Sequence, residues 1–228
     1  MYFPCLRYNE HMRPLKSQSY LRFPLTTYLG NEGSVRLLRV LFAHGGALSV
    51  AQLARDSGLT TRGARQTIEN LTGSKLLKRF GQSRAQVFSI DFQNPLANAL
   101  KALFDSEQTH GENVVREIRE VLTATAQVES AWYYGSAARG DDTQNSDFDI
   151  VVLSKEGEAD SATEAVRAAL QGVEDRFCVT CSVVGLSRSD AIRLSKGDPW
   201  WDNVIRDAKV LKGASPEQYV AELKKSVP

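Results

Sequence analysis

The chain has 228 residues, of which 42% are hydrophobic and 24% charged, and its formal net charge is +1. This composition is typical of a soluble globular protein with one large or two small domains. No apolar run is long enough to span a membrane, and the first residues lack the apolar core of a signal peptide. Three cysteines, an odd number, argue against a disulfide framework and favour a cytoplasmic location.

The charge is distributed unevenly along the chain. Residues 1–93 contain 13 Lys and Arg against 5 Asp and Glu, whereas residues 94–228 contain 15 against 22. The first part therefore carries a net charge of +8 and the second a net charge of −7. A basic half followed by an acidic half suggests two domains, the basic one binding nucleic acid. The alternative is chance segregation of surface charge.

Residues 1–30 are rich in aromatic side chains but show no helical or strand period. We expect them to form an arm that packs on the body of the protein or on a second subunit.

Residues 31–93 predict three helices and a hairpin. Gly45-Gly46 ends the first helix, and Ser49-x-x-Gln52 is a capping box that begins the second. A third helix begins at Thr60 or Thr61, and strands at 76–80 and 85–90 follow. The residues expected on the buried faces of the helices are Val35, Leu38, Leu41, Phe42, Val50, Leu53, Ala54, Ala64, Ile68 and Leu71.

This order of elements resembles a winged helix-turn-helix domain. The resemblance implies that the third helix enters the major groove of duplex DNA and that the wing contacts the backbone. Two alternatives stay open: a winged helix used only for protein contact or dimerisation, and arginines that are merely solvated. The residues assigned to DNA are Thr61, Arg62, Arg65, Gln66, Lys78, Arg79 and Arg84.

Residues 94–127 read as a helical connector. His110-Gly111 divides it into two predicted helices, each with one apolar face. Because regulators with such domains usually bind two half-sites as dimers, we expect this connector to pair subunits in a homodimer.

The segment 132–153 carries the strongest chemical signal. It reads as a strand, a tight Gly135-Ser136 turn opening a short helix, and a second strand with Asp147 and Asp149. Residues two apart on a strand share a face, so the two carboxylates point the same way and suit a hard divalent cation. The glycine and the free N–H groups at the helix start suit a phosphate.

The string Gly135-Ser136, Ala138-Arg139-Gly140, Ser146-Asp147 and Asp149 resembles the signature of DNA polymerase β-like nucleotidyltransferases. The variety called minimal nucleotidyltransferases, often found as toxin–antitoxin partners, is the most similar. The resemblance implies that Asp147 and Asp149 are catalytic and hold Mg²⁺ or Mn²⁺. It also implies that an NTP is bound by Gly135, Ser136, Arg139 and Ser146. Arg139 could instead pair with Asp141 or Asp142, and the two aspartates could merely cap a turn.

The fold class predicted is α+β, a winged helix-turn-helix followed by a small mixed-sheet nucleotidyltransferase domain with flanking helices at 128–228. Further helices are expected around 162–170, from Ser187, over 199–209 and from Ser215, with a strand over 176–186. The family places a third carboxylate on that later strand. Here the strand has no acid, and Ser182 occupies the position, with Thr180 on the same face.

Two functions follow from these residues. The first is a DNA-binding, magnesium-dependent enzyme that transfers a nucleoside monophosphate from an NTP to an acceptor hydroxyl. The second is a winged-helix transcription regulator, antitoxin-like, whose nucleotidyltransferase domain binds nucleotide with weak or no catalysis. Cys178 and Cys181 are expected to be buried structural thiols, and Trp200-Trp201 to be core.

Overall fold

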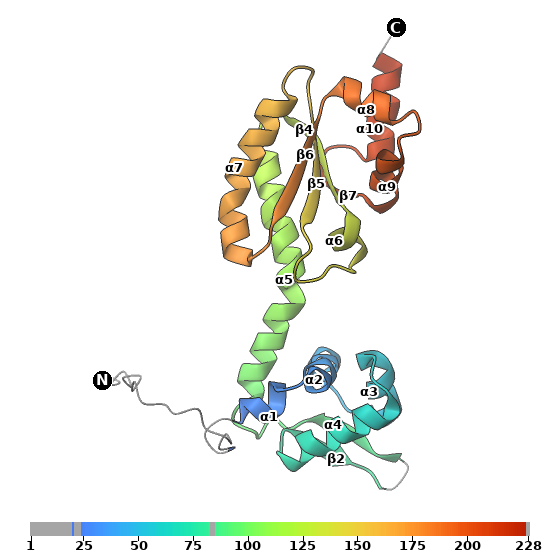
Figure 1. The fold of residues 1–228 in the computed structure, drawn as a ribbon. Coiled ribbons are helices and arrows are strands. Elements are labelled where there is room, and N and C mark those ends of the chain that lie inside the picture. The colour runs from blue at the N-terminus through green and yellow to red at the C-terminus, as the bar shows by residue number, and fades with distance from the viewer. Residues whose placement is uncertain (1–19, 21–23, 83–84, 227–228) are drawn as a thin grey trace, which may run out of the picture. The chain divides into compact units, whose positions relative to one another are not determined.

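The computed structural model describes residues 20, 24–82 and 85–226 (Figure 1). The chain divides into two compact units, Met1–Gln108 and Thr109–Pro228, which we call unit 1 and unit 2. The division falls inside one helix, α5, which spans Ala97–Ala124. No helix within the described residues is both long enough and apolar enough to cross a membrane.

Unit 1 begins with α1 and continues with the helices and strands that the pattern of residues 31–93 predicts. The β-strands form one antiparallel sheet in the order β1-β3-β2. A two-residue strand, β1, was not predicted, and it pairs Leu48 with Phe88 of β3. The elements are α1 Leu25–Leu29, α2 Glu32–His44, β1 Leu48–Ser49, α3 Val50–Ser57, α4 Thr61–Gly73, β2 Leu77–Phe80 and β3 Val87–Ile90.

Local hydrogen bonds explain where these helices begin. Asn31 Oδ1 accepts from Ser34 N (2.8 Å) at α2, and Thr60 Oγ1 accepts from Gly63 N (3.1 Å) at α4. The predicted capping box is confirmed, because Ser49 and Gln52 each accept from the other's backbone N–H at α3. The buried helix faces agree with prediction except at Val35 and Val50, which are half-buried.

The end of the predicted arm packs on the core of unit 1. Tyr28 on α1 is 2% exposed. Its hydroxyl accepts from Asn94 Nδ2 (2.9 Å) and lies 3.3 Å from the hydroxyl of Tyr20. Residues 1–19 and 21–23, and with them His11, lie outside the described residues.

Helix α5 is continuous, so the predicted break at His110-Gly111 is wrong. Glycine in a helix interior costs roughly 0.5–1 kcal/mol relative to alanine. The packing of the residues on both sides of Gly111 outweighs this cost. The two parts of α5 serve different cores. Ala97, Leu100 and Phe104 pack in unit 1, whereas the cluster in unit 2 receives Val114, Ile118 and Leu122.

Within the described residues of unit 2, the strands form one mixed sheet in the order β6-β5-β4-β7. β4 is antiparallel to β5 and to β7, whereas β5 and β6 are parallel. The mixed sheet confirms the predicted fold class. The strands are β4 Val128–Tyr134, β5 Phe148–Ser154, β6 Cys181–Leu186 and β7 Lys209–Lys212, and the further helices are α6 Gly135–Arg139, α7 Ala159–Phe177, α8 Arg188–Leu194, α9 Pro199–Asp207 and α10 Pro216–Ser226.

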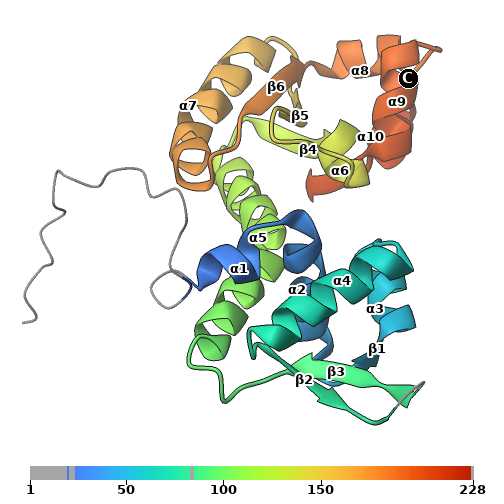
Figure 2. The ribbon, with the colours of Figure 1, turned by 60° about the horizontal axis from the view of Figure 1, so that its bottom comes forward.

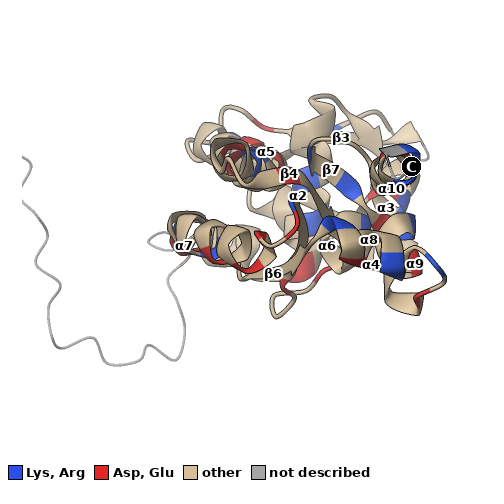
Figure 3. Cartoon of the chain, turned by 90° about the horizontal axis from the view of Figure 1, so that it is seen from above, with Lys and Arg blue, Asp and Glu red and all other residues tan. Residues whose placement is uncertain are grey.

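Helices cover both faces of this sheet (Figures 1 and 2). α5 and α7 pack with Ile150 and Val152 on one face, and α8, α9 and α10 pack with Val151 and Leu153 on the other. Trp201, 1% exposed, lies in the second cluster, and Trp200 packs against it, which confirms that the Trp pair is core. Basic and acidic residues occur together along α7 and α8 (Figure 3).

Two boundaries and the burial of two thiols in unit 2 differ from the prediction. Arg176 and Phe177 end α7 rather than begin a strand, because Cys178 adopts a left-handed conformation (φ 54°) that stops the helix. Cys178 is exposed and Cys181 half-buried, so the expected burial of both thiols is wrong. The predicted helix 199–209 ends at Asp207, and Lys209 begins the edge strand β7.

Glu129 joins the start of β4 to two helices. Its carboxylate accepts hydrogen bonds from Arg188 Nε (3.0 Å) and from the Tyr219 hydroxyl (2.8 Å), and its side chain is 21% exposed. The hydrogen bond from Arg188 is the main cause that lowers the pKa of Glu129. A carboxyl group whose pKa is lowered by folding stabilises the protein above its unfolded pKa, and that stabilisation is lost on acidification.

We expect Glu129→Gln to reduce the free energy of unfolding by about 1–2 kcal/mol at neutral pH, because the charged hydrogen bonds are lost. The difference from the unaltered protein should shrink as the pH falls below the ordinary glutamate pKa of about 4.3 and vanish once the pH is below the lowered pKa of folded Glu129. Urea unfolding at several pH values measures this. Glu164→Gln, at an exposed position of α7, should change little at any pH. A pH-independent loss at Glu129 would contradict the ionic explanation.

Candidate active site

The two aspartates lie where β5 begins. Asp149 is the second residue of the strand and is half-buried, whereas Asp147 immediately precedes the strand and is exposed. The prediction that both lie on the strand is therefore wrong by one residue. They are nevertheless close enough to interact: burial, and then the negative charge of Asp147, raise the pKa of Asp149. A bound cation would relieve both effects.

The turn after β4 brings the backbone of Gly135 against the Asp149 carboxylate. Tyr134 is the register partner of Asp149 across β4 and β5. Gly135 follows with φ +72°, and a Cβ placed there would lie 2.8 Å from Asp149 Oδ2. Both the left-handed conformation and the close approach require glycine at this position. Gly135 and Ser136 begin α6, a helix of five residues.

The strand on the other side of Asp149 supplies a hydroxyl group. Asp149 is in register with Ser182 of β6, so the prediction that Ser182 lies beside the Asp strand is confirmed. A hydrogen bond from the Ser182 side chain acts against the other two effects and lowers the pKa of Asp149. Over the described part of the chain, no group of three or more His, Cys, Asp or Glu side chains could hold a metal. The site thus offers two carboxylates and one hydroxyl.

Arg139 is held by carboxylates. It forms ion pairs with Asp207 of α9 (2.6 Å) and with Asp141 (3.2 Å), and the Asp207 side chain is only 6% exposed. Arg206 and then Arg139 lower the pKa of Asp207. The pairing with Asp141 is one of the two alternatives that the sequence left open. Sequence reasoning missed Asp207, because it lies 68 residues away with no motif to connect it.

The remaining nucleotide-site residue, Ser146, closes the loop before β5. Its Oγ accepts from Thr143 N (2.9 Å) and lies 3.1 Å from Thr143 Oγ1. The roles of Gly135, Ser136 and Ser146 in binding a nucleotide stay predictions.

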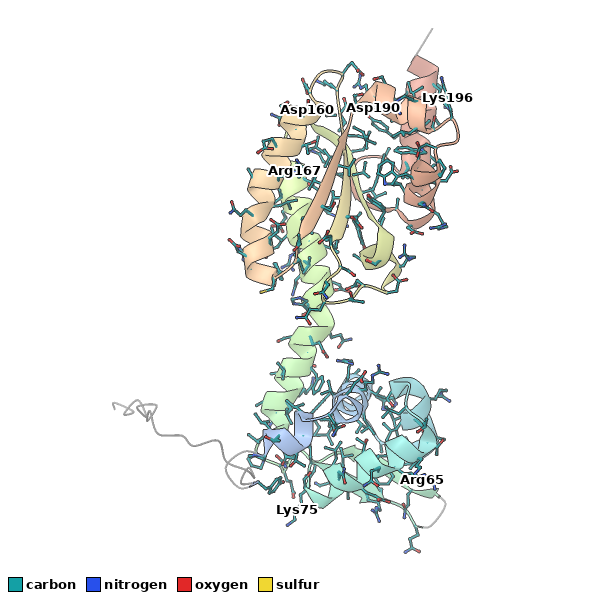
Figure 4. All side chains as sticks on the ribbon, in the orientation of Figure 1. Arg65, Lys75, Asp160, Arg167, Asp190 and Lys196 are labelled. Carbon is teal, nitrogen blue, oxygen red and sulfur yellow. The ribbon has the colours of Figure 1, made fainter. Side chains whose placement is uncertain are left out.

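The residues predicted to contact DNA lie on α4 and β2 of unit 1. Thr61, Arg62, Arg65 and Gln66 are all exposed on α4. Figure 4 shows Arg65 projecting from that helix. Arg65 also lines a groove of about 640 Å³ together with residues of α3, β2 and β3.

The basic side chains described on β2 of the hairpin contact other residues of the protein. Lys78 pairs with Asp91 (2.8 Å), and the Arg79 guanidinium lies over the Phe88 ring at 5.7 Å from its centroid. Arg84 lies outside the described residues. The structure therefore gathers most of the proposed DNA-contacting residues on α4.

Comparison with known proteins identifies the class of unit 2. The family model described as "Polymerase beta, Nucleotidyltransferase" matches residues 116–212, which include β4, α6, β5, β6 and β7. Residues 116–212 therefore match a nucleotidyltransferase domain of this family, which supports nucleotidyl transfer in general. No curated protein matches the sequence.

Solved structures resemble the chain over about half its length. One, described as a toxin–antitoxin with AMP-PNP, is 18% identical and has a TM-score of 0.36; the match covers 49% of this chain and 84% of that one. Two variant structures of the toxin–antitoxin MntA-HpeT are 14% and 18% identical, with TM-scores of 0.33 and 0.32. Each match covers 50% of this chain, and 84% and 82% of the respective structures.

Gly135→Ala should displace the Asp149 carboxylate, because the added Cβ would overlap Oδ2. We expect a loss of stability above the roughly 1 kcal/mol that alanine costs in a left-handed conformation. Gly140→Ala is the matched control: φ there is +79°, and nothing in the described structure lies within 4 Å of its added Cβ. Thermal unfolding of the two variants measures the difference. Equal losses would show that the contact with Asp149 imposes no constraint.

Proposed function

We propose that unit 2 binds an NTP together with Mg²⁺ or Mn²⁺ and transfers the nucleoside monophosphate to an acceptor hydroxyl. The observation that supports this most directly is the juxtaposition of the Gly135-Ser136 turn with Asp147 and Asp149. The turn offers backbone N–H groups and a hydroxyl to phosphate oxygens. The carboxylates are the oxygen ligands that such cations prefer.

In the proposed reaction, the acceptor oxygen bonds to the α-phosphorus of the NTP. The bond from that phosphorus to the bridging oxygen breaks, and pyrophosphate leaves with the electron pair. The acceptor proton passes to water or to a carboxylate. A divalent cation held by Asp147 and Asp149 would supply neutralising charge. The chain's own contribution is to hold the triphosphate at Gly135 in line with the acceptor.

The serine at position 182 bears on whether the domain transfers the nucleotide or only binds it. A hydroxyl is a neutral ligand, so the site would hold one cation better than two. That favours the alternative in which the domain binds nucleotide but transfers it slowly or not at all. Under this alternative the protein is a DNA-binding regulator, antitoxin-like, that senses nucleotide.

Asp149→Asn should weaken Mg²⁺-dependent ATP binding at least tenfold in calorimetric titrations, because the half-buried anion is lost. Asp175→Asn removes an exposed carboxylate of α7 and serves as the control, with unchanged affinity. Equal affinities in all three proteins would place the nucleotide elsewhere.

Ser182→Asp should tighten metal binding and raise any transfer from labelled NTP, because it adds the third anion beside Asp149. Ser182→Ala removes the hydroxyl without adding charge and should not raise transfer. Robust transfer by the unaltered protein that Ser182→Asp leaves unchanged or lowers would show that the third acid comes from elsewhere.

We further propose that residues 31–93 are a winged helix-turn-helix that binds duplex DNA through α4. The support is the +8 charge of residues 1–93 and the exposure of Thr61, Arg62, Arg65 and Gln66 on one helix. Residues 94–127 would connect it to the nucleotidyltransferase domain and pair two chains as a homodimer on two half-sites.

Changing Arg62 and Arg65 together to Ala should weaken DNA binding about tenfold or more and flatten its dependence on salt concentration. The matched control changes Arg36 and Arg39 on α2 to Ala, which removes equal charge from residues paired with Glu32 and Glu107. Fluorescence anisotropy with labelled genomic fragments at several salt concentrations measures both. Equal weakening by the two double variants would show that binding depends only on net charge. A lack of binding by the unaltered protein would exclude the proposal.

A further inference from the structure

Gly111 occupies a position in α5 where a large apolar side chain is expected. Phe104, Gly111 and Ile118 are spaced seven residues apart, so they lie along one side of the helix. Phe104 and Ile118 are buried, whereas Gly111 is exposed. An added Cβ at Gly111 would meet nothing within 4 Å in the described part of the protein. The chain's own packing therefore does not require glycine at this helix-destabilising position.

A cavity of about 640 Å³ opens beside Gly111 within unit 2. This volume is in the range of small-molecule sites. It lies on the α5 side of the sheet, because Phe148, which lines it, packs with α5 and α7. Asp149, the next residue along β5, points to the opposite face. The cavity thus opens on the side of the sheet opposite to the Asp149 side chain, although Ala137 of α6 also lines it.

The walls of the cavity are flat and apolar. The rings of Tyr133 and Phe148 stack with centroids 5.0 Å apart and planes inclined by 21°. Val115 and Val179 complete the wall, and all four residues are half-buried, so part of each is accessible. Phe148 stacks on the Tyr133 ring, and Lys209 Nζ lies over that same ring at 5.7 Å from its centroid. The Phe148 ring and the edges of both rings are therefore the surfaces that can stack on a planar ring system or meet it edge to face.

The rim combines hydrogen-bond donors and acceptors. Arg119 offers guanidinium N–H groups, and Glu112 and Asp142 offer carboxylate oxygens; all three are exposed. The two carboxylates are balanced by the Arg119 guanidinium and by the Lys209 ammonium, which lies over the Tyr133 ring. These charged groups sum to zero and suit a neutral ligand better than one with several negative charges. Donors and acceptors around a flat apolar wall match the edge of a neutral heteroaromatic ring.

We propose that this cavity binds a nucleobase, as the free base or as a nucleoside, at a second site distinct from the Asp147 and Asp149 site. Gly111 leaves the entrance open, Phe148 stacks on the bound ring with the edge of Tyr133 beside it, and Arg119, Glu112 and Asp142 receive the polar edge of the ring. The proposal does not depend on transferase activity.

The test uses adenosine as the probe and the full chain, with calorimetric titration. We expect adenosine to bind, AMP to bind several-fold more weakly, and ribose not to bind. Gly111→Leu should fill the entrance and weaken adenosine binding at least tenfold. Gly172→Leu is the matched control: Gly172 also lies in a helix, α7, with open space around its added Cβ among the described atoms, and it does not line the cavity.

Three further variants separate an effect on the cavity from an effect on folding or on the carboxylate site. Gly111→Ala and Gly172→Ala should both raise the melting temperature by a similar few degrees (~2–4 °C), which would show that Gly111 is not needed for folding. Asp149→Asn should retain adenosine binding while it loses Mg²⁺-dependent ATP binding. Unweakened binding by Gly111→Leu, loss of adenosine in Asp149→Asn, or no binding by the unaltered protein would each overturn the second site. Tighter binding of AMP than of adenosine would overturn the neutral ligand.

Discussion

The close approach of the Gly135 backbone to the Asp149 carboxylate is the constraint on which the candidate site depends. At the end of β4, a side chain at position 135 would be strained by the left-handed backbone and would have to displace Asp149 Oδ2. Because Asp149 is in register with Tyr134 on one side and Ser182 on the other, three strands converge on a single carboxylate. Its surroundings disfavour ionisation, which a bound cation would reverse.

The alternation of side chains along β5 gives the two faces of the sheet different packing partners. Ile150 and Val152 hold α5 and α7, and Val151 and Leu153 hold the helices after β6. Only near the start of the strand does this apolar alternation give way to charge. The carboxylates therefore sit at the rim of a fully packed sheet. Strand β5 positions Asp149, and the start of α6 lies against the carboxylate of that residue.

Features fixed by neighbours in sequence could be predicted, and those fixed by distant contacts could not. The capping box at Ser49 and the helix start at Ser187 depend only on residues three positions apart, and both are present. The place of Ser182 followed from a family resemblance that supplied the strand order. No local sequence pattern indicates the ion pair between Arg139 and Asp207. The edge strand β7 is four residues long, too short for periodicity to reveal.

The clearest error in the prediction from local sequence patterns concerns a glycine. A glycine after a histidine is an ordinary helix stop, yet α5 passes through His110-Gly111 without interruption. Tertiary packing on both sides of the pair outweighs the local preference. The same residue leaves the opening beside Tyr133 and Phe148, so the position where sequence reasoning failed is also where the structure offers a site.

Helix α5 also determines how this protein can be taken apart. Each unit buries one half of the helix in its own core, and the boundary at Gln108 and Thr109 falls between the halves. A truncation at residue 94 or at residue 127, where the charge pattern or the strand pattern changes, would strip one unit of an entire packing surface. Isolated segments of twelve or so residues are marginal helices in water. Fragments meant to fold independently should therefore both retain residues 97–124, even though this duplicates the helix.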